Sequence, residues 1–297
     1  MATPWRSPPR RRARPRPPIR RARAGVLGAC SWSLQPTSPS DLADKLAACG
    51  VAWTQLALTP LREGRLDADE TLRELERRGV RVRSGMVQTI GEDYASLKAI
   101  ERTGGVRLDQ HWPANRANLE AEARLARQLE LELVTLHAGF LPHERGAERS
   151  KLLERLRTLV DIFAAQGVRV GFETGQESAS TLLEVLEELD RPLAGVNFDP
   201  ANMILYGMGD PVAALRSLWP HVLQVHIKDA RAARKRGEWG EEMPTGEGQV
   251  DWRAFFEILA DKLPGIDCMI EREMGDARVQ DIATAARLVR AHRGAAA

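Results

Sequence analysis

The chain of 297 residues has little cysteine and no long apolar run. Its three cysteines, Cys30, Cys49 and Cys268, are odd in number and far apart, which argues against a disulfide framework and fits a reducing compartment. No apolar run approaches the roughly 18 residues that a membrane-spanning helix requires. We therefore expect a cytoplasmic protein with no membrane partner.

The motifs that mark nucleotide-binding sheets are also missing. No Gly-x-Gly-x-x-Gly follows the first predicted strand, at residues 25–31, and no P-loop pattern occurs in the chain. These absences disfavour a doubly wound open sheet, which is the main alternative for a chain in which strands and helices alternate.

Acidic residues are absent from residues 1–24, a segment with nine Arg and six Pro. Such a composition cannot build a core, so we expect a disordered basic tail. A transit peptide and an arm that binds nucleic acid are the alternatives. The positive charge of these nine arginines exceeds the net charge of +2 of the whole chain, so residues 25–297 carry a net negative charge. This mildly acidic composition argues against a specific nucleic-acid partner.

From residue 25 onward, β-like apolar runs alternate with helical patterns. Ser38-Pro39 and Asp210-Pro211 mark helix starts, because in each a capping side chain precedes proline. Eight strands are predicted, at residues 25–31, 51–58, 80–87, 131–137, 168–173, 193–199, 222–226 and 266–271. This alternation over this length is typical of a TIM barrel. We predict an α/β protein with a single (β/α)₈ barrel domain at residues 25–297.

Catalytic residues of such barrels lie at the C-terminal ends of the strands. Four consecutive predicted strands end in Glu173, Asp199, His226 and Glu271, each after apolar residues. Burying three neighbouring carboxylates is costly, and a divalent cation would supply the missing positive charge. Carboxylates with one imidazole suit Mn²⁺, Mg²⁺, Co²⁺ or Zn²⁺. Strand-end caps or pairs with arginine are the alternative for each residue alone.

A cation flanked by two glutamates supports proton transfer beside a ketose carbonyl. The cation polarises the carbonyl and stabilises an enediolate, while the glutamates remove and return a proton. Return to the same carbon on the opposite face gives epimerisation, and return to the adjacent carbon gives isomerisation. Loss of a β-substituent from the same enediolate would instead give a lyase or dehydratase.

These residues resemble the xylose isomerase-like TIM barrel superfamily, which includes sugar-phosphate isomerases and epimerases. The motifs that carry the resemblance are Gly-Phe-Glu-Thr-Gly at 171–175, Asn-Phe-Asp-Pro-Ala-Asn at 197–202, Val-His-Ile-Lys-Asp at 225–229, Gly-Glu-Gly-Gln-Val-Asp-Trp at 246–252 and Ile-Glu-Arg-Glu at 270–273. The resemblance implies that Glu173, Asp199, His226 and Glu271 hold one divalent metal ion. It also implies that Glu173 and Glu271 are the catalytic acid–base pair.

Some positions depart from the pattern of the superfamily. Asn202 stands where the epimerases usually have histidine, and Gln55 lies near the position of a missing strand-2 carboxylate. Only His137 and His226 of the six histidines fall at strand ends, so a trinuclear zinc site is not expected. The resemblance further implies that Glu247 supports the metal-bound region from its loop.

Six residues are expected to contact the substrate, namely Trp32, Trp112, His137, Asn202, Lys228 and Arg272. The two tryptophans could stack on a sugar ring, with ordinary packing as the equal alternative. Lys228 and Arg272 would bind anionic or hydroxyl groups, or form ion pairs with Asp229 or Glu273. The loop at 231–250 is rich in glycine and charge, which suggests a lid.

The function predicted from these residues is a metal-dependent isomerase or epimerase of a keto sugar or sugar phosphate. A lyase or dehydratase that acts on a keto-sugar, keto-glycoside or inosose is the alternative enzyme. A catalytically inactive sugar-binding barrel is the alternative outside catalysis. The expected partner is a small carbohydrate, and because members of the superfamily often form dimers or tetramers, a homo-oligomer is a further expectation.

Overall fold

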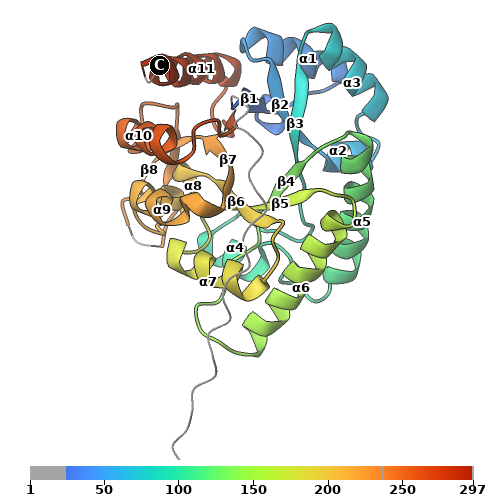
Figure 1. Ribbon diagram of the computed structural model, residues 1–297, viewed down its shortest axis with the longest axis vertical. Coiled ribbons are helices and arrows are strands. Elements are labelled where there is room, and N and C mark those ends of the chain that lie inside the picture. Colours follow the sequence, from blue (N-terminus) through green and yellow to red (C-terminus); the bar gives the residue numbers. More distant parts are fainter. Residues whose placement is uncertain (1–24, 236, 296–297) are drawn as a thin grey trace, which may run out of the picture.

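The computed structural model describes residues 25–235 and 237–295 (Figure 1). The predicted basic tail at residues 1–24 lies outside these described residues. Eight parallel strands close into a barrel in the order β1-β10-β7-β6-β5-β4-β3-β2. They are β1 (Leu27–Cys30), β2 (Trp53–Ala57), β3 (Arg81–Met86), β4 (Leu133–Leu136), β5 (Arg169–Glu173), β6 (Ala194–Phe198), β7 (Val222–Ile227) and β10 (Cys268–Ile270). The predicted (β/α)₈ barrel is confirmed.

Helices surround the strands on all sides in Figure 1. The longer ones are α1 (Pro39–Ala48), α3 (Ala68–Arg77), α4 (Leu97–Thr103), α5 (Trp112–Gln128), α6 (Ala147–Ala164), α7 (Ala179–Leu189), α9 (Pro211–Leu218), α10 (Trp252–Lys262) and α11 (Arg278–Ala295). Short turns of helix are α2 (Thr59–Arg62), α8 (Pro200–Leu205), η1 (Ser31–Leu34) and η2 (Trp219–His221). Among the described helices, none has both the length and the apolarity to cross a membrane.

Polar caps and apolar faces fix where the helices begin and how they pack. The side chains of Ser38 and Asp210 accept hydrogen bonds from the backbone N–H three residues later, at the starts of α1 and α9. Along α6, Leu156, Leu159 and Phe163 are fully buried against the barrel. The helical spacing of these residues in the sequence therefore produces the contact between helix and sheet.

The barrel closes between β1 and β10 at the end opposite the carboxyl ends of its strands. Val26 donates its backbone N–H to Asp267 Oδ1 over 2.9 Å. The Arg293 guanidinium of α11 donates to the carbonyl oxygens of Gly25 and Ile266, at 2.9 and 2.7 Å. The C-terminal helix thus holds the first and last strands together.

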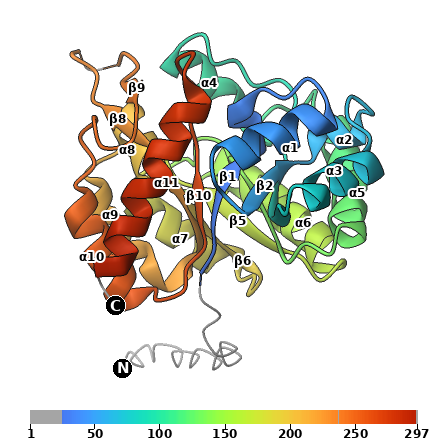
Figure 2. The ribbon, with the colours of Figure 1, turned by 90° about the horizontal axis from the view of Figure 1, so that it is seen from above.

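The loop predicted as a lid, at 231–250, begins at the end of one strand and contains another, and the two form a second, antiparallel sheet. Its strands are β8 (Asp229–Arg231) and β9 (Glu241–Met243), and they lie at one end of the barrel with α4 in Figure 2. Gly240 donates its N–H to the Leu205 carbonyl, and the Trp239 ring lies 4.9 Å from the Tyr206 ring. The hairpin is therefore attached to α8 and to the turn that follows it.

Candidate metal centre

The four predicted ligands come together at the carboxyl ends of β5, β6, β7 and β10. One ligand atom from each of Glu173, Asp199, His226 and Glu271 lies within 4.8 Å of all the others. His226 Nδ1 is 3.5 Å from Glu173 Oε1, 3.5 Å from Asp199 Oδ2 and 3.4 Å from Glu271 Oε2. All four side chains are buried. One imidazole nitrogen therefore faces three carboxylates inside the protein.

Two atoms of this cluster are buried without a hydrogen-bond partner. They are His226 Nδ1 and Asp199 Oδ2. Buried polar atoms are rarely left unpaired, and a bound water or ion is one explanation where they are. One imidazole and three carboxylates are a donor set that suits a divalent cation. The residues present therefore fit such an ion.

The electrostatics of the two glutamates favour ionised carboxylates. Burial opposes the charge on Glu271, but Lys228 and His226 hold the pKa of this carboxyl well below its ordinary value. Burial also opposes the charge on Glu173, where His137 and His226 lower the pKa. Both groups are therefore negatively charged at neutral pH and can accept a proton.

The pKa values of Asp199 and His226 are raised above their ordinary values. Burial raises the pKa of Asp199, and Glu271 and Glu173 add to this effect. Burial disfavours a charged His226, yet the carboxylates of Glu173 and Glu271 raise the pKa of the ring well above its usual value. The negative charge of the carboxylates around His226 therefore favours a positive charge at the centre of this cluster.

Hydrogen bonds fix the orientation of Glu271. Trp32 Nε1 donates to Glu271 Oε1 over 2.6 Å, and Lys228 Nζ donates to Oε2 over 2.9 Å. The Trp32 ring centroid lies 6.1 Å from that of His226. Trp32, which the sequence marks as a substrate contact, therefore lies beside the candidate ligands and also positions one of them.

Glu173 is oriented from the adjoining strand β6 and from helix α8. Asn202 Nδ2 donates to Glu173 Oε1 over 2.8 Å, and Asn197 Nδ2 donates to Oε2 over 3.3 Å. Gly175, with φ of +138°, permits this approach, because a Cβ there would meet the Cβ of Asn202 at 2.5 Å. His137 Nε2 lies 3.7 Å from Glu173 Oε1. Both Asn202 and His137 are thus in place beside the cluster.

Helix α8 starts directly at Asp199 and orients its carboxylate. Asp199 Oδ1 accepts the backbone N–H of Asn202 over 2.9 Å as the N-terminal cap. Oδ2 is left facing His226. One oxygen therefore serves the fold while the other remains for the candidate ion.

Lys228 and Arg272 are both engaged by carboxylates. Lys228 Nζ lies 2.9 Å from Glu271 Oε2 and 2.6 Å from Glu273 Oε2. Arg272 donates to Glu242 Oε1 over 2.7 Å and to Asp281 Oδ2 over 2.9 Å. The pairing with Glu273 was weighed from the sequence, but Glu242 was missed because it comes from β9 in the predicted lid.

Trp112 and Glu247 have other surroundings. Trp112 begins α5, where its ring lies 5.4 Å from the Arg155 guanidinium carbon, and its role in substrate binding stays a prediction.

Glu247 is exposed. The motif around it surrounds Asp229, which accepts the N–H groups of Gly246, Gly248 and Val250, of its neighbour Ala230 and of the Trp252 indole. A Cβ at Gly248 would meet Asp229 Oδ1 at 2.0 Å, which explains the glycine.

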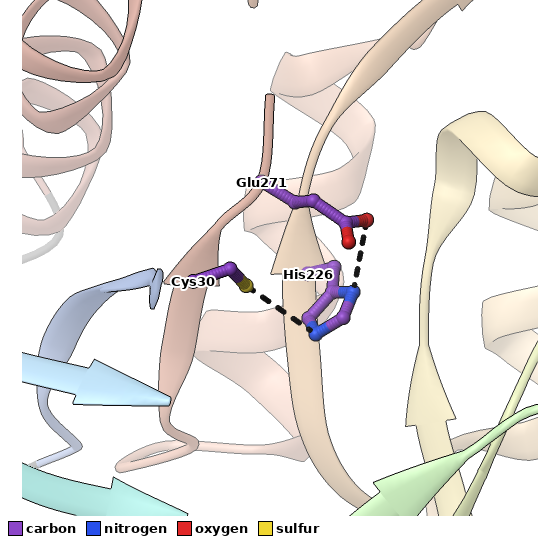
Figure 3. A group of neighbouring side chains, drawn as sticks. All are labelled: Cys30, His226 and Glu271. Atoms are coloured by element: carbon purple, nitrogen blue, oxygen red, sulfur yellow. Dashed lines mark hydrogen bonds and ion pairs between the residues drawn. The ribbon is translucent and has the colours of Figure 1, made fainter. Parts of the chain in front are cut away.

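Cys30 lies beside the His226 ring nitrogen that does not face Glu271 (Figure 3), and its Sγ lies within 4.8 Å of a Glu271 oxygen. Its Sγ is 3.8 Å from His226 Nε2, and its side chain is fully buried. Burial raises the pKa of the thiol to about 12, so it stays protonated at neutral pH. This environment is typical of a structural cysteine.

We expect the thiol of Cys30 to be unreactive in the folded protein. Iodoacetamide labelling followed by mass spectrometry should leave Cys30 unmodified under native, mildly alkaline conditions, because the thiol is both inaccessible and protonated. Labelling in guanidinium chloride is the control and should modify it. Rapid native modification would contradict the described burial.

The comparisons with solved structures agree with this architecture. The xylose isomerase domain protein from Planctomyces limnophilus is 33% identical, with a TM-score of 0.78 over 84% of this chain and 91% of that chain. The probable 3-DHS dehydratase AsbF from Bacillus anthracis shares the fold, with 18% identity, a TM-score of 0.69 and coverage of 90% and 98%. The D-psicose 3-epimerase from Clostridium cellulolyticum H10 does so as well, with 13% identity, a TM-score of 0.65 and the same coverage.

Matches in sequence cover different lengths of the chain. The uncharacterized protein YihM from Escherichia coli strain K12 is 33% identical over 79 residues, which span 26% of this chain and 24% of YihM. The sequence profile of the xylose isomerase-like TIM barrel family matches residues 43–292. The chain therefore belongs to the xylose isomerase-like TIM barrel family.

Proposed function

We propose that this protein is a divalent-metal-dependent epimerase or isomerase of a keto sugar. The observation that carries the proposal is the buried group of four ligand atoms within 4.8 Å, in which His226 Nδ1 faces three carboxylates. Two of these carboxylates, Glu173 and Glu271, come from β5 and β10, which are separated by β6 and β7 in the barrel. They therefore approach the centre from two sides.

A divalent cation held by these four residues would polarise a ketose carbonyl and offset the negative charge of an enediolate. Glu173 and Glu271, whose carboxylates are ionised, would exchange a proton with the substrate carbon. Trp32 and Lys228 hold the Glu271 carboxylate in one orientation, while Asn197 and Asn202 hold that of Glu173. We assign His137, whose Nε2 lies 3.7 Å from Glu173 Oε1, to a contact with a substrate hydroxyl.

Solvent-proton exchange tests this proposal directly. Residues 25–297 are incubated with D-fructose, D-tagatose or D-psicose in D₂O, with Mn²⁺ or Mg²⁺, and ¹H NMR follows the carbon-bound protons. We expect deuterium to enter beside the carbonyl and epimeric or isomeric products to form, and both to stop after chelation. Exchange followed by loss of a substituent would instead support the lyase. Sugar binding without exchange would support the inactive barrel.

The charges around the centre favour a substrate without a phosphate group. Lys228 is held by Glu271 and Glu273, with Glu242 at 3.8 Å, and Arg272 is held by Glu242 and Asp281. This excess of negative charge repels anions.

We therefore expect kcat/KM for unphosphorylated ketoses to exceed that for their 6-phosphates by at least about tenfold. The variant Glu273→Gln releases one partner of Lys228 and should reduce this preference, whereas Glu247→Gln, at an exposed site, should leave it unchanged. Coupled measurement of epimer formation for each sugar pair gives the ratio. Faster turnover of the phosphates by the wild type would overturn the charge assignment and leave the proposed reaction intact.

A further inference from the structure

Beneath the candidate ligands, the interior of the barrel is polar where bulky apolar side chains are usual in this fold. Fully buried polar residues project from five of the eight strands and form hydrogen bonds with one another. They are Gln55 on β2, Ser84 on β3, Thr135 on β4, Asn197 on β6 and Gln224 on β7. This polar layer lies directly against the His226 ring through Gln55 and Asn197.

The orientation of the Gln55 amide follows from its partners. Its Nε2 donates to the Gly85 carbonyl over 3.3 Å and to Thr135 Oγ1 over 2.7 Å. A backbone carbonyl can only accept, so the amide nitrogen must be at that end. Thr135 is free to accept, because its hydroxyl donates to Met86 Sδ. Gln224 Nε2 donates to the opposite end, Gln55 Oε1, over 3.0 Å, which agrees with this orientation.

This orientation determines which His226 nitrogen carries a proton. Gln55 Oε1 lies 2.8 Å from His226 Nε2, and an amide oxygen can only accept, so Nε2 must donate. Asn197 Nδ2 lies 3.0 Å from Nε2 and by itself would favour an accepting Nε2, but the Gln55 contact is the shorter of the two, and Nδ2 has another acceptor in Glu173 Oε2. When a divalent cation takes the place of the second ring proton, the proton on Nε2 remains and the lone pair lies on Nδ1, the buried atom that lacks a hydrogen-bond partner.

We propose that Gln55 is a positioning residue that holds His226 in the Nε2–H tautomer and thereby presents the Nδ1 lone pair to the divalent cation. The proposal rests on the metal centre of the proposed function. Figure 3 shows the geometry, in which Nδ1 points toward Glu271 and the other ring nitrogen points toward Cys30. An amide on β2 thus binds behind the candidate ligand. Partners of this kind fix the tautomer and the ring orientation of metal-binding histidines.

The test compares a substitution of Gln55 with a control at the same ring edge. Gln55→Leu removes the acceptor, and Cys30→Ala changes another neighbour of Nε2. Isothermal titration calorimetry with Mn²⁺ gives Kd. We expect Kd to rise about 10- to 100-fold in Gln55→Leu and to stay within a few-fold of wild type in Cys30→Ala. Circular dichroism checks that each variant is folded.

A second measurement needs no variant. In the Zn²⁺-loaded wild type, long-range ¹H–¹⁵N NMR of the histidine rings should show a proton on His226 Nε2 and a metal-shifted Nδ1. Metal at Nε2, or a Gln55→Leu variant that is folded and binds Mn²⁺ like wild type, would overturn the role of Gln55 while the metal centre stands. A wild type that binds no divalent cation would overturn both. A Co²⁺–thiolate absorption band would place the ion at Cys30 and reject the assignment.

Discussion

Glu271→Gln is expected to lower the rate of proton exchange and product formation by about 10²- to 10⁴-fold while the barrel stays folded. Glutamine matches the shape of glutamate and still offers an oxygen to Trp32 Nε1 or Lys228 Nζ, which now donate to the carboxylate. It cannot take up a proton from a carbon acid. Single-turnover NMR in D₂O measures the rate, and circular dichroism measures the fold.

Glu273→Gln is the matched control for this experiment. Glu273 follows two residues later and also pairs with Lys228, but its side chain is half exposed and does not belong to the four-ligand cluster. Glu273→Gln should therefore lower turnover much less than Glu271→Gln does. Wild-type turnover by Glu271→Gln would remove Glu271 from the acid–base role, and a selective loss in Glu273→Gln would transfer that role to Glu273.

Asp199→Ala is expected to abolish stoichiometric binding of a divalent ion. The loss should exceed the roughly 10- to 100-fold that changes behind a ligand cause, because a ligand itself is removed. Elemental analysis after dialysis against Mn²⁺ or Zn²⁺ measures the bound metal in wild type and variant.

Asp199→Asn separates the ligand from the helix cap. Alanine also removes the N-terminal cap of α8, which is worth about 1 kcal/mol, whereas asparagine keeps an acceptor for the Asn202 N–H. We expect weak metal binding in both variants but a loss of thermal stability mainly in the alanine variant. Full retention of metal by Asp199→Ala would exclude Asp199 as a ligand.

The strand ends were predictable because each polar residue directly follows an apolar run. In Glu173, Asp199 and His226 the side chain comes at or next to the end of a buried strand, so the barrel brings them together once the strand count is right. The fold class followed from the same alternation of strands and helices. Local sequence patterns were sufficient for both.

The partners of the charged residues were not predictable, because they depend on distant segments. Glu242 reaches Arg272 only because residues of the predicted lid pair as β8 and β9. Gln55 meets His226 across 171 residues of sequence, and its polar character does not show which ring nitrogen it binds. Trp112 shows the same limit, since nothing in its sequence neighbourhood indicates that its ring faces Arg155.

The closure of the barrel at Gly25 and Val26 has a practical consequence for attaching the protein to a surface. These residues precede β1, whereas Glu271 and its neighbours lie beyond the opposite ends of the strands. An affinity tag or solid support joined ahead of residue 25 therefore holds the molecule by the end of the barrel away from the candidate centre. Immobilisation in this orientation leaves the end of the barrel with the candidate metal centre facing the solution. Sugars and metal ions can then be exchanged over one tethered sample.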